Sequence, residues 1–249
     1  MTRFKDNFSK QSLIYSRYRP GYPVGLFAFL RTLTRDSDLA WDCGTGNGQC
    51  ALSLARYYKT VYATDPSDAQ IQNATAHPNI IYKVEPAEHP GLSDNSVDLV
   101  TIAQALHWFK FDKFYAEVKR VLKPNGIIAA WAYGLPSISA EIDPLLRHFH
   151  DVVLGEYWLY ENRLIDKEYT TIPFPFMELE TPGFEMQKAF SFDEFIGLLN
   201  TWSAVQSFIK KNGNNPVSEL EPVFKERWLV NEVPKMFTWK LILRVGRYC

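Results

Sequence analysis

The stretch Leu39–Gln49, LAWDCGTGNGQ, decides the fold. It begins with a short apolar run that has the character of a buried strand, and three glycines at alternate positions follow. A helix is predicted over Gln49–Tyr58, so the glycines occupy a tight strand-to-helix turn. Because glycine has no Cβ, a ligand can approach the main chain of such a turn closely.

Strand and helix patterns alternate on both sides of this turn. Helices are predicted over Leu26–Leu33, Ser67–Ala76 and a stretch that begins near Phe111, is capped by Asp112 and ends at the Pro124-Asn125-Gly126 turn. Strands are predicted over Leu39–Cys43, Val61–Thr64, Ile80–Val84, Val97–Ala103 and Ile127–Tyr133. This alternation indicates βαβ units and a parallel sheet, with a ligand crevice at the carboxyl ends of its strands.

The pattern changes after Gly134. We expect a helix over Asp143–Leu154, a strand over Phe184–Phe190, one or two helices over Phe192–Lys210 and a last strand over Lys235–Arg247. The predicted fold is α/β, a Rossmann-like doubly wound sheet of about seven mostly parallel strands with a lid insertion, its last two strands partly antiparallel. We divide one domain, 1–249, into an N-terminal cap segment (1–25), a cofactor-binding core (26–134), a lid insertion (135–183) and C-terminal helices with the final strands (184–249).

Composition narrows the function classes. Hydrophobic residues make up 46% of the 249 and the formal net charge is −1, which argues against a disordered chain and against a general nucleic-acid binder. The three cysteines have no CxxC spacing, so neither a metal site nor a disulfide framework is expected. No signal peptide or membrane-spanning run is visible, and we expect a cytoplasmic protein without a membrane partner. The oligomeric state stays open.

Two acidic residues accompany the glycine turn. Asp42 ends the first strand, where its carboxylate can face an ammonium group, and Asp65 ends the second, 21 residues after Gly44. An acid at that second position typically accepts hydrogen bonds from ribose hydroxyls. Dinucleotide sites use GxGxxG, whereas the spacing here is GxGxG, which favours the phosphate-free S-adenosylmethionine. A nucleotide-dependent oxidoreductase and a ligand-free tight turn remain as alternatives.

Four segments together resemble the core of class I S-adenosylmethionine-dependent methyltransferases. They are DCGTGNG (42–48), ATDPSDAQI (63–71), VEPAEHPGLSDNSVDLVTIAQALHWF (84–109) and FYAEVKRVLKPNGIIAAW (114–131). Outside this core, SRYRPGYP (16–23) and TWSAV (201–205) resemble the small-molecule subgroup that includes trans-aconitate methyltransferase. The resemblance implies S-adenosyl-L-methionine as the cofactor.

The resemblance also implies which residues hold that cofactor. Asp42 and the three glycines would form the floor under its methionine and ribose, and Asp65 would hold the ribose hydroxyls. The glycines of the floor are Gly44, Gly46 and Gly48. Around the adenine, the resemblance implies Pro66 and Gln70 beside the ring and Ala87 and Glu88 at its edge. It also implies Gln104 and Ala105 along the methionine and sulfonium, and Tyr15 and Arg19 closing over the ligand.

The expected reaction is methyl transfer to a small molecule, with a carboxylate as one option for the acceptor. His107 follows the fourth strand and is the candidate general base, with a packed histidine as the alternative interpretation. Trp108, Tyr157 and Trp158 are candidate walls of the acceptor pocket. Alternative functions are a scaffold that binds S-adenosylmethionine without catalysis, and a methyltransferase that acts on protein or RNA.

Overall fold

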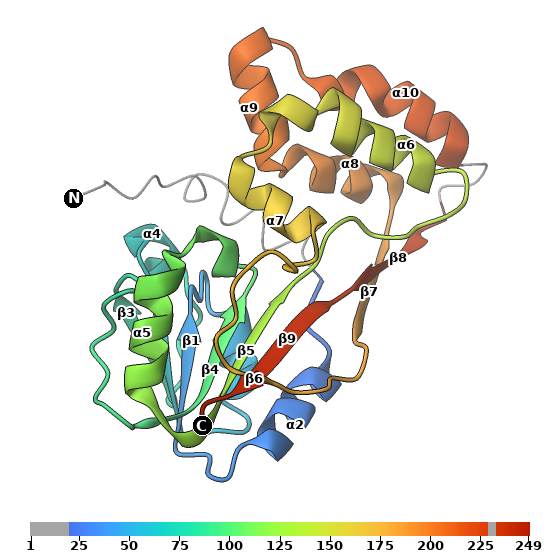
Figure 1. Cartoon of the computed structure of the whole chain (residues 1–249). Coiled ribbons are helices and arrows are strands. Elements are labelled where there is room, and N and C mark those ends of the chain that lie inside the picture. Colours follow the sequence, from blue (N-terminus) through green and yellow to red (C-terminus); the bar gives the residue numbers. More distant parts are fainter. Residues whose placement is uncertain (1–19, 229–232) are drawn as a thin grey trace.

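The computed structural model describes residues 20–228 and 233–249, which form a twisted sheet flanked by helices and a group of helices above it (Figure 1). The large sheet has the strand order β3-β2-β1-β4-β5-β9-β6. Its members are β1 (Leu39–Cys43), β2 (Thr60–Asp65), β3 (Ile80–Val84), β4 (Val97–Ala103), β5 (Leu122–Ala132), β6 (Met177–Glu178) and β9 (Ile242–Arg247). The first five are parallel, whereas β9 pairs antiparallel with both β5 and β6. This sheet of seven mostly parallel strands confirms the predicted Rossmann-like class.

The helices beside the sheet are shorter than predicted at two places. They are α2 (Val24–Leu33), α3 (Gln49–Leu54), α4 (Asp68–Gln72) and α5 (Phe111–Val121). Helix α3 stops at Leu54 because the chain turns inward to bury Tyr58, whose hydroxyl lies 3.0 Å from the Thr34 hydroxyl. Helix α4 ends at Gln72, where the side-chain Nδ2 of Asn73 donates to the Ala69 carbonyl and closes the last turn. The expected Asp112 cap is also wrong, since α5 begins after Lys110 without a side-chain cap.

A helical cap lies over the carboxyl ends of the parallel strands (Figure 1). We use this name for residues 143–166 and 192–228, which contain α6 (Asp143–His148), a π-helical turn (Phe149–Val153), α7 (Arg163–Asp166), α8 (Phe192–Asn200), α9 (Ser203–Asn212) and α10 (Pro216–Trp228). Phe149 joins the two stretches, because its buried ring contacts those of Trp202 and Phe224 with centroids 6.1 and 6.3 Å away. The helix predicted over Asp143–Leu154 is thus present, with its second half wound as a π-turn.

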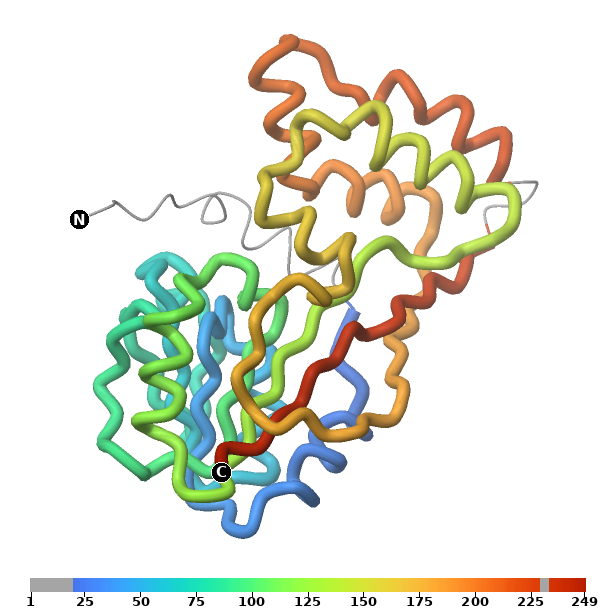
Figure 2. The backbone as a smooth tube through the Cα atoms, viewed as in Figure 1, coloured from blue at the N-terminus to red at the C-terminus, as the bar shows by residue number. Residues whose placement is uncertain are grey.

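The chain passes between sheet and cap several times (Figure 2). One pair of crossings is the two-stranded sheet of β7 (Glu185–Phe190) and β8 (Lys235–Lys240). The strand predicted over Phe184–Phe190 therefore does not join the large sheet, and its place there is taken by the two-residue β6. The strand predicted over Lys235–Arg247 is two strands, because the chain bends at the buried Leu241, whose amide donates to the Phe184 carbonyl. Among the described residues, no helix is long and apolar enough to span a bilayer.

Candidate cofactor-binding site

Residues from four strand ends meet beneath the cap. The turn after β1, the end of β2, and the loops after β3 and β4 all lie at the carboxyl edge of parallel strands, where open α/β sheets bind ligands. The loop after β3 contains Ala87 and Glu88, and the loop after β4 contains Gln104 and Ala105. The topology thus brings together every strand-end residue that the sequence singled out.

The glycine turn has backbone angles that favour glycine. Gly44, Gly46 and Gly48 have φ values of +71°, +55° and +87°. A Cβ on Gly44 would lie 2.5 Å from the Cβ of Ala105, and one on Gly48 would lie 2.2 Å from the Tyr82 hydroxyl oxygen. A Cβ on Gly46 would meet nothing closer than 3.9 Å. The outer glycines are therefore required by the neighbouring Ala105 and Tyr82 side chains, while the middle one leaves its main chain open to a ligand.

Asp65 binds the glycine turn directly. Its Oδ2 accepts a hydrogen bond of 2.9 Å from the Gly46 amide, and its Oδ1 accepts one of 2.9 Å from the Ser67 amide at the start of α4. The main chain of β2 adds to this, because the Thr64 carbonyl accepts from the amides of Gly44 and Thr45. The carboxylate is half-buried, and its two oxygens offer about four acceptor sites in all. It can therefore hold the turn and accept from ligand hydroxyls at once.

Asp42 is fully buried, and its carboxylate is held by two hydroxyl groups. Thr45 Oγ1 donates to its Oδ2 at 2.6 Å, and Thr101 Oγ1 of β4 donates to its Oδ1 at 2.8 Å. Burial raises the pKa of Asp42 above its usual range, although these hydrogen bonds oppose the shift. Among residues 20–228 and 233–249, no cationic side chain forms an ion pair with it. A buried acidic group without a cationic partner among these residues thus lies behind the glycine turn.

The residues expected near an adenine lie on the same side of the sheet. Pro66 and Gln70 are half-buried at the start of α4, and the nearest heavy atom to an added Cβ on Gly46 is Gln70 Oε1. Ala87 is buried. Glu88 is not a free loop acid, because its Oε1 accepts a 3.0 Å hydrogen bond from the Lys110 amide before α5. Glu88 therefore joins the loop after β3 to the start of α5.

Gln104 has a conformation that marks the end of β4. Its φ is +57°, which is uncommon outside glycine and recurs at functional sites. Its amide donates to the Trp131 carbonyl at 2.8 Å, and its Nε2 donates to the Tyr133 carbonyl at 3.1 Å. Its Oε1 is buried without a hydrogen-bond partner. The adjacent Ala105 is buried against Gly44, so this loop touches the glycine turn.

His107 is buried rather than open to the crevice. Its Nδ1 lies 2.7 Å from the hydroxyl oxygen of Tyr169, which follows α7. Tyr169 is also fully buried, has a φ of +58°, and its pKa is raised by burial. The pair connects the loop after β4 to the segment that leaves the cap. This geometry favours the packed-histidine interpretation over a general base.

The three candidate pocket residues are all half-buried, but two of them have partners inside the cap. The Trp158 Nε1 donates to the His150 carbonyl at 3.0 Å. The Tyr157 hydroxyl accepts from the Asn212 amide at 2.9 Å. Trp108 instead contacts His107, with ring centroids 4.9 Å apart. Of the three, Trp108 is the one next to the cofactor-side loop. Tyr15 and Arg19 lie outside the described residues.

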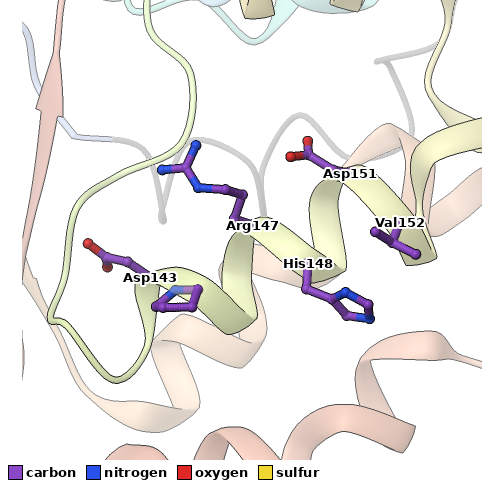
Figure 3. A pocket seen from close by; sticks show the side chains of 6 residues that line it. Asp143, Arg147, His148, Asp151 and Val152 are labelled. Carbon is purple, nitrogen blue, oxygen red and sulfur yellow. The ribbon is translucent and has the colours of Figure 1, made fainter.

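A hollow of about 440 Å³ runs along the surface of α6 and the π-turn (Figure 3). Its lining side chains are those of Asp143, Pro144, Arg147, His148, Asp151 and Val152. Figure 3 shows Arg147 and Asp151 on one side of the helix and His148 on the other. None of the strand-end residues lines this hollow, so it is separate from the site built around the glycine turn.

Acidic side chains also gather away from this site, at the start of β1. Within the described part of the chain, Asp36, Asp38 and Asp98 form the one group of potential metal ligands close enough to share an ion. Lysines already neutralise it, because Lys123 Nζ lies 2.7 Å from Asp98 and Lys59 Nζ lies 2.8 Å from Asp38. Asp98 also accepts from the amides of Asp38 and Leu39. These bonds fix the start of β1.

Sequence reasoning missed three contributors to the site. Thr45 and Thr101 hold the Asp42 carboxylate, and Tyr82 packs its hydroxyl against Gly48. Burial and the nearby Asp42 charge raise the pKa of Tyr82 to about 12. Thr45 lies inside the glycine motif, so its position was a usable signal. Thr101 and Tyr82 are ordinary strand residues by pattern, and only the strand register brings them here.

The chain is similar to methyltransferases both in sequence and in structure. Residues 41–130 match a family profile described as a methyltransferase domain. A Dictyostelium discoideum protein named as a methyltransferase is 35% identical over 224 residues, covering 88% of this chain and 85% of that protein. CRG1 of Saccharomyces cerevisiae, named as an S-adenosylmethionine-dependent methyltransferase, is 30% identical over 141 residues, covering 52% and 48%. A structure described as a type II methyltransferase from Anaeromyxobacter dehalogenans is 40% identical, covers 92% of this chain and 97% of that one, and has a TM-score of 0.86.

Proposed function

The chain belongs to the class I S-adenosylmethionine-dependent methyltransferases, and on that premise we propose that it methylates a small molecule at the crevice beneath the helical cap. The bond between Asp65 and the Gly46 amide carries this proposal, because it joins an acid suited to a ribose with an open glycine main chain. S-adenosylmethionine supplies a methyl group already activated by a positive sulfur. The protein has to bind, orient and exclude water.

The site residues fit this cofactor at three points. The open main chain at Gly46 accommodates a flat nucleoside, and the Asp65 carboxylate beside it is a hydrogen-bond acceptor suited to ribose hydroxyls. The buried charge of Asp42 favours an ammonium group in the crevice. The remaining proposed contacts follow the expected pattern: Pro66, Gln70, Ala87 and Glu88 around the adenine, Gln104 and Ala105 along the methionine, and Tyr15 and Arg19 from the N-terminal cap segment.

The position of the cap is one reason to propose a small molecule as the methyl acceptor. It covers the carboxyl edge of the sheet (Figure 1), and a covered crevice suits a compact substrate better than a folded macromolecule. The near-neutral charge argues in the same direction, and so does the resemblance to the small-molecule subgroup. We propose that residues 135–183 act as the lid together with α8–α10. The acceptor pocket then includes Trp108, with Tyr157 and Trp158 supporting the lid from within the cap.

Two measurements test the proposal. Asp65→Ala is expected to weaken binding of S-adenosylhomocysteine by about 1–3 kcal/mol in calorimetry, the usual cost of losing hydrogen bonds to a charged group. Asp68→Ala is the matched control, because that carboxylate is exposed on α4 and contacts Gln72 instead of the turn. Equal affinities for the two variants would contradict the ribose role. Incubation of a metabolite extract with labelled cofactor would then identify the methylated small molecule, and labelling confined to added protein or RNA would overturn the acceptor class.

A further inference from the structure

The loop between β3 and β4 is closed on itself by the carboxylate of Glu85, its first residue. Glu85 Oε2 accepts a 2.9 Å hydrogen bond from the Gly91 amide, which lies further along the same loop. The Tyr62 hydroxyl of β2 donates to the same carboxylate, 2.9 Å from Oε1 and 3.0 Å from Oε2. Burial and the Glu85 carboxylate raise the pKa of Tyr62 to about 12, so this hydroxyl keeps the proton that it donates. The loop therefore has a fixed base.

A side chain at position 91 would disturb this closure. A Cβ on Gly91 would lie 2.9 Å from the Tyr62 hydroxyl oxygen and 3.0 Å from Glu85 Oε1. The base of the loop is also joined to the proposed cofactor site, because the Glu85 amide donates to the Asp65 carbonyl at 3.2 Å. The closed loop and the acid proposed for the ribose are thus fixed relative to each other.

The far side of the loop is held by Arg120 of α5. Its guanidinium donates to the Leu92 carbonyl at 2.7 Å and forms an ion pair with Asp94, also at 2.7 Å. Leu92 is buried and packs in the same core cluster as Ala87. Because the loop is bound at its base, at its far side and through two buried side chains, its shape is set before a ligand binds.

Ala87 lies in a turn of this loop, where its carbonyl is free. The His89 amide donates to the Pro86 carbonyl at 3.1 Å, which makes a turn with Ala87 and Glu88 at its centre. Within the described part of the chain, the Ala87 carbonyl accepts no hydrogen bond. Pro86 and His89 are exposed and Glu88 is half-buried, so the turn is open to solvent. The loop thus offers a main-chain acceptor to a ligand at the carboxyl edge of the sheet.

We propose that Glu85 is a positioning residue through which the cofactor site selects adenine over other purine bases. The amino group of adenine can donate to the free Ala87 carbonyl, whereas hypoxanthine carries an oxygen at that position and would place it against the carbonyl. Selection requires that the carbonyl keep one position, and the closure by Glu85 fixes that position without a cost on binding. The inference rests on the proposed function and names what reads the base of its cofactor.

Two ligands measure how well the base is selected. S-adenosylhomocysteine and S-inosylhomocysteine differ only at the base, where an oxygen replaces the amino group. In calorimetry, we expect the unaltered protein to prefer the adenine compound roughly 10-fold or more, the effect of one polar group left unpaired. In Glu85→Ala, affinity for S-adenosylhomocysteine should fall roughly 5- to 30-fold, the cost of ordering about one residue of the loop on binding. The preference should fall to about threefold or less, since a mobile carbonyl can turn away from an oxygen.

Three further variants separate positioning from a general loss of structure. Glu85→Gln retains an oxygen for the Gly91 amide and should keep most of the preference for adenine. Should Glu85→Ala not fold, Tyr62→Phe removes only the hydroxyl that holds the carboxylate, and it should lower the preference roughly threefold. Asp94→Ala is the matched control, because this exposed acid near the loop contacts Arg120 and not the closure. It should change neither affinity by more than about twofold.

The ratio of the two affinities decides the outcome. An unchanged ratio in Glu85→Ala, or an equal fall of the ratio in Asp94→Ala, would overturn the positioning role. An unaltered protein that binds both ligands equally would also overturn it, because the base would then not be read. These results would leave the cofactor site in place. Failure of the unaltered protein to bind S-adenosylhomocysteine would instead contradict the proposed function, and this inference with it.

Discussion

The Asp42→Asn variant tests whether the buried carboxylate is kept for its charge. Asparagine has nearly the same shape, and it can keep hydrogen bonds with the two hydroxyl groups that hold the carboxylate. Thr45 still donates to the remaining oxygen. The Thr101 hydroxyl lies 3.5 Å from the Trp41 carbonyl and can turn toward it while accepting from the new amide. The substitution therefore removes the negative charge and little else.

The expected effect is a loss of affinity for ligands that carry an ammonium group. An interaction with a charged partner contributes about 1.5–3 kcal/mol. That corresponds to a loss of roughly 10- to 150-fold in affinity for S-adenosylhomocysteine. Binding of 5′-methylthioadenosine, which has the same nucleoside but no amino-acid portion, should stay within about threefold of the unaltered protein, below 1 kcal/mol.

Calorimetry with both ligands separates the two acids of the site. Asp65→Ala should weaken both ligands, because both contain the ribose, whereas Asp42→Asn should weaken only S-adenosylhomocysteine. Circular dichroism and thermal melting confirm that each variant is folded. The reasoning about Asp42 fails if its variant loses affinity for 5′-methylthioadenosine to the same extent, since the residue would then shape the turn and not attract the ammonium group.

Three further predictions concern stability and loop geometry. Because burial raises the pKa of Asp42, the folded protein holds that proton more tightly than the unfolded chain, so this group costs stability as pH rises above the ordinary aspartate range. Urea unfolding at pH 3, below that range, and at pH 8 should show Asp42→Asn gaining stability relative to the unaltered protein at the higher pH, and an equal difference at both values would contradict this. His107→Phe removes the buried hydrogen bond between the imidazole and the Tyr169 hydroxyl and should cost about 1–3 kcal/mol of unfolding free energy. We expect the acidic limb of its pH–rate profile to remain, and its disappearance would restore the general-base role. Gly44→Ala places a Cβ 2.5 Å from the Cβ of Ala105 and adds about 1–2 kcal/mol of left-handed backbone strain, so S-adenosylhomocysteine binding should be lost. Gly134→Ala is the control, because its added Cβ meets nothing within 4 Å and the variant should bind normally.

The strands in the first half of the fold could be predicted from the sequence, because each depends on a pattern of neighbouring residues. Each strand from Leu39 to Ala103 is an apolar run closed by a turn, and the structure reproduces these runs within one residue. The glycine spacing predicted a tight turn, and the structure has positive φ at Gly44 and Gly48, a conformation that glycine adopts readily. The ends of the helices were harder to predict. The stop of α3 depends on the contact between Tyr58 and Thr34, which are 24 residues apart.

The second half depends on contacts between distant segments. Phe184–Phe190 and Lys235–Arg247 both alternate like strands, but nothing in the alternation says that the first pairs only with the beginning of the second. The cap has the same character, because Phe149 becomes a core residue only when α10 brings Phe224 against it. Arg120 is a further example: its guanidinium binds the carbonyls of Pro90 and Leu92 and fixes the loop that precedes β4.

The buried polar groups explain how cap and cofactor loop are held together. The loop after β4 is bound from below by its contact with Gly44 and from above by the bond between His107 and Tyr169. Tyr169 is itself fixed, because the Arg244 guanidinium of β9 donates to its carbonyl and to that of Ile172. A movement of the cap therefore acts on this loop through Tyr169, and the loop carries Gln104 and Ala105 of the proposed cofactor site. The position of the loop after β4 and the placement of the cap thus depend on the same few residues.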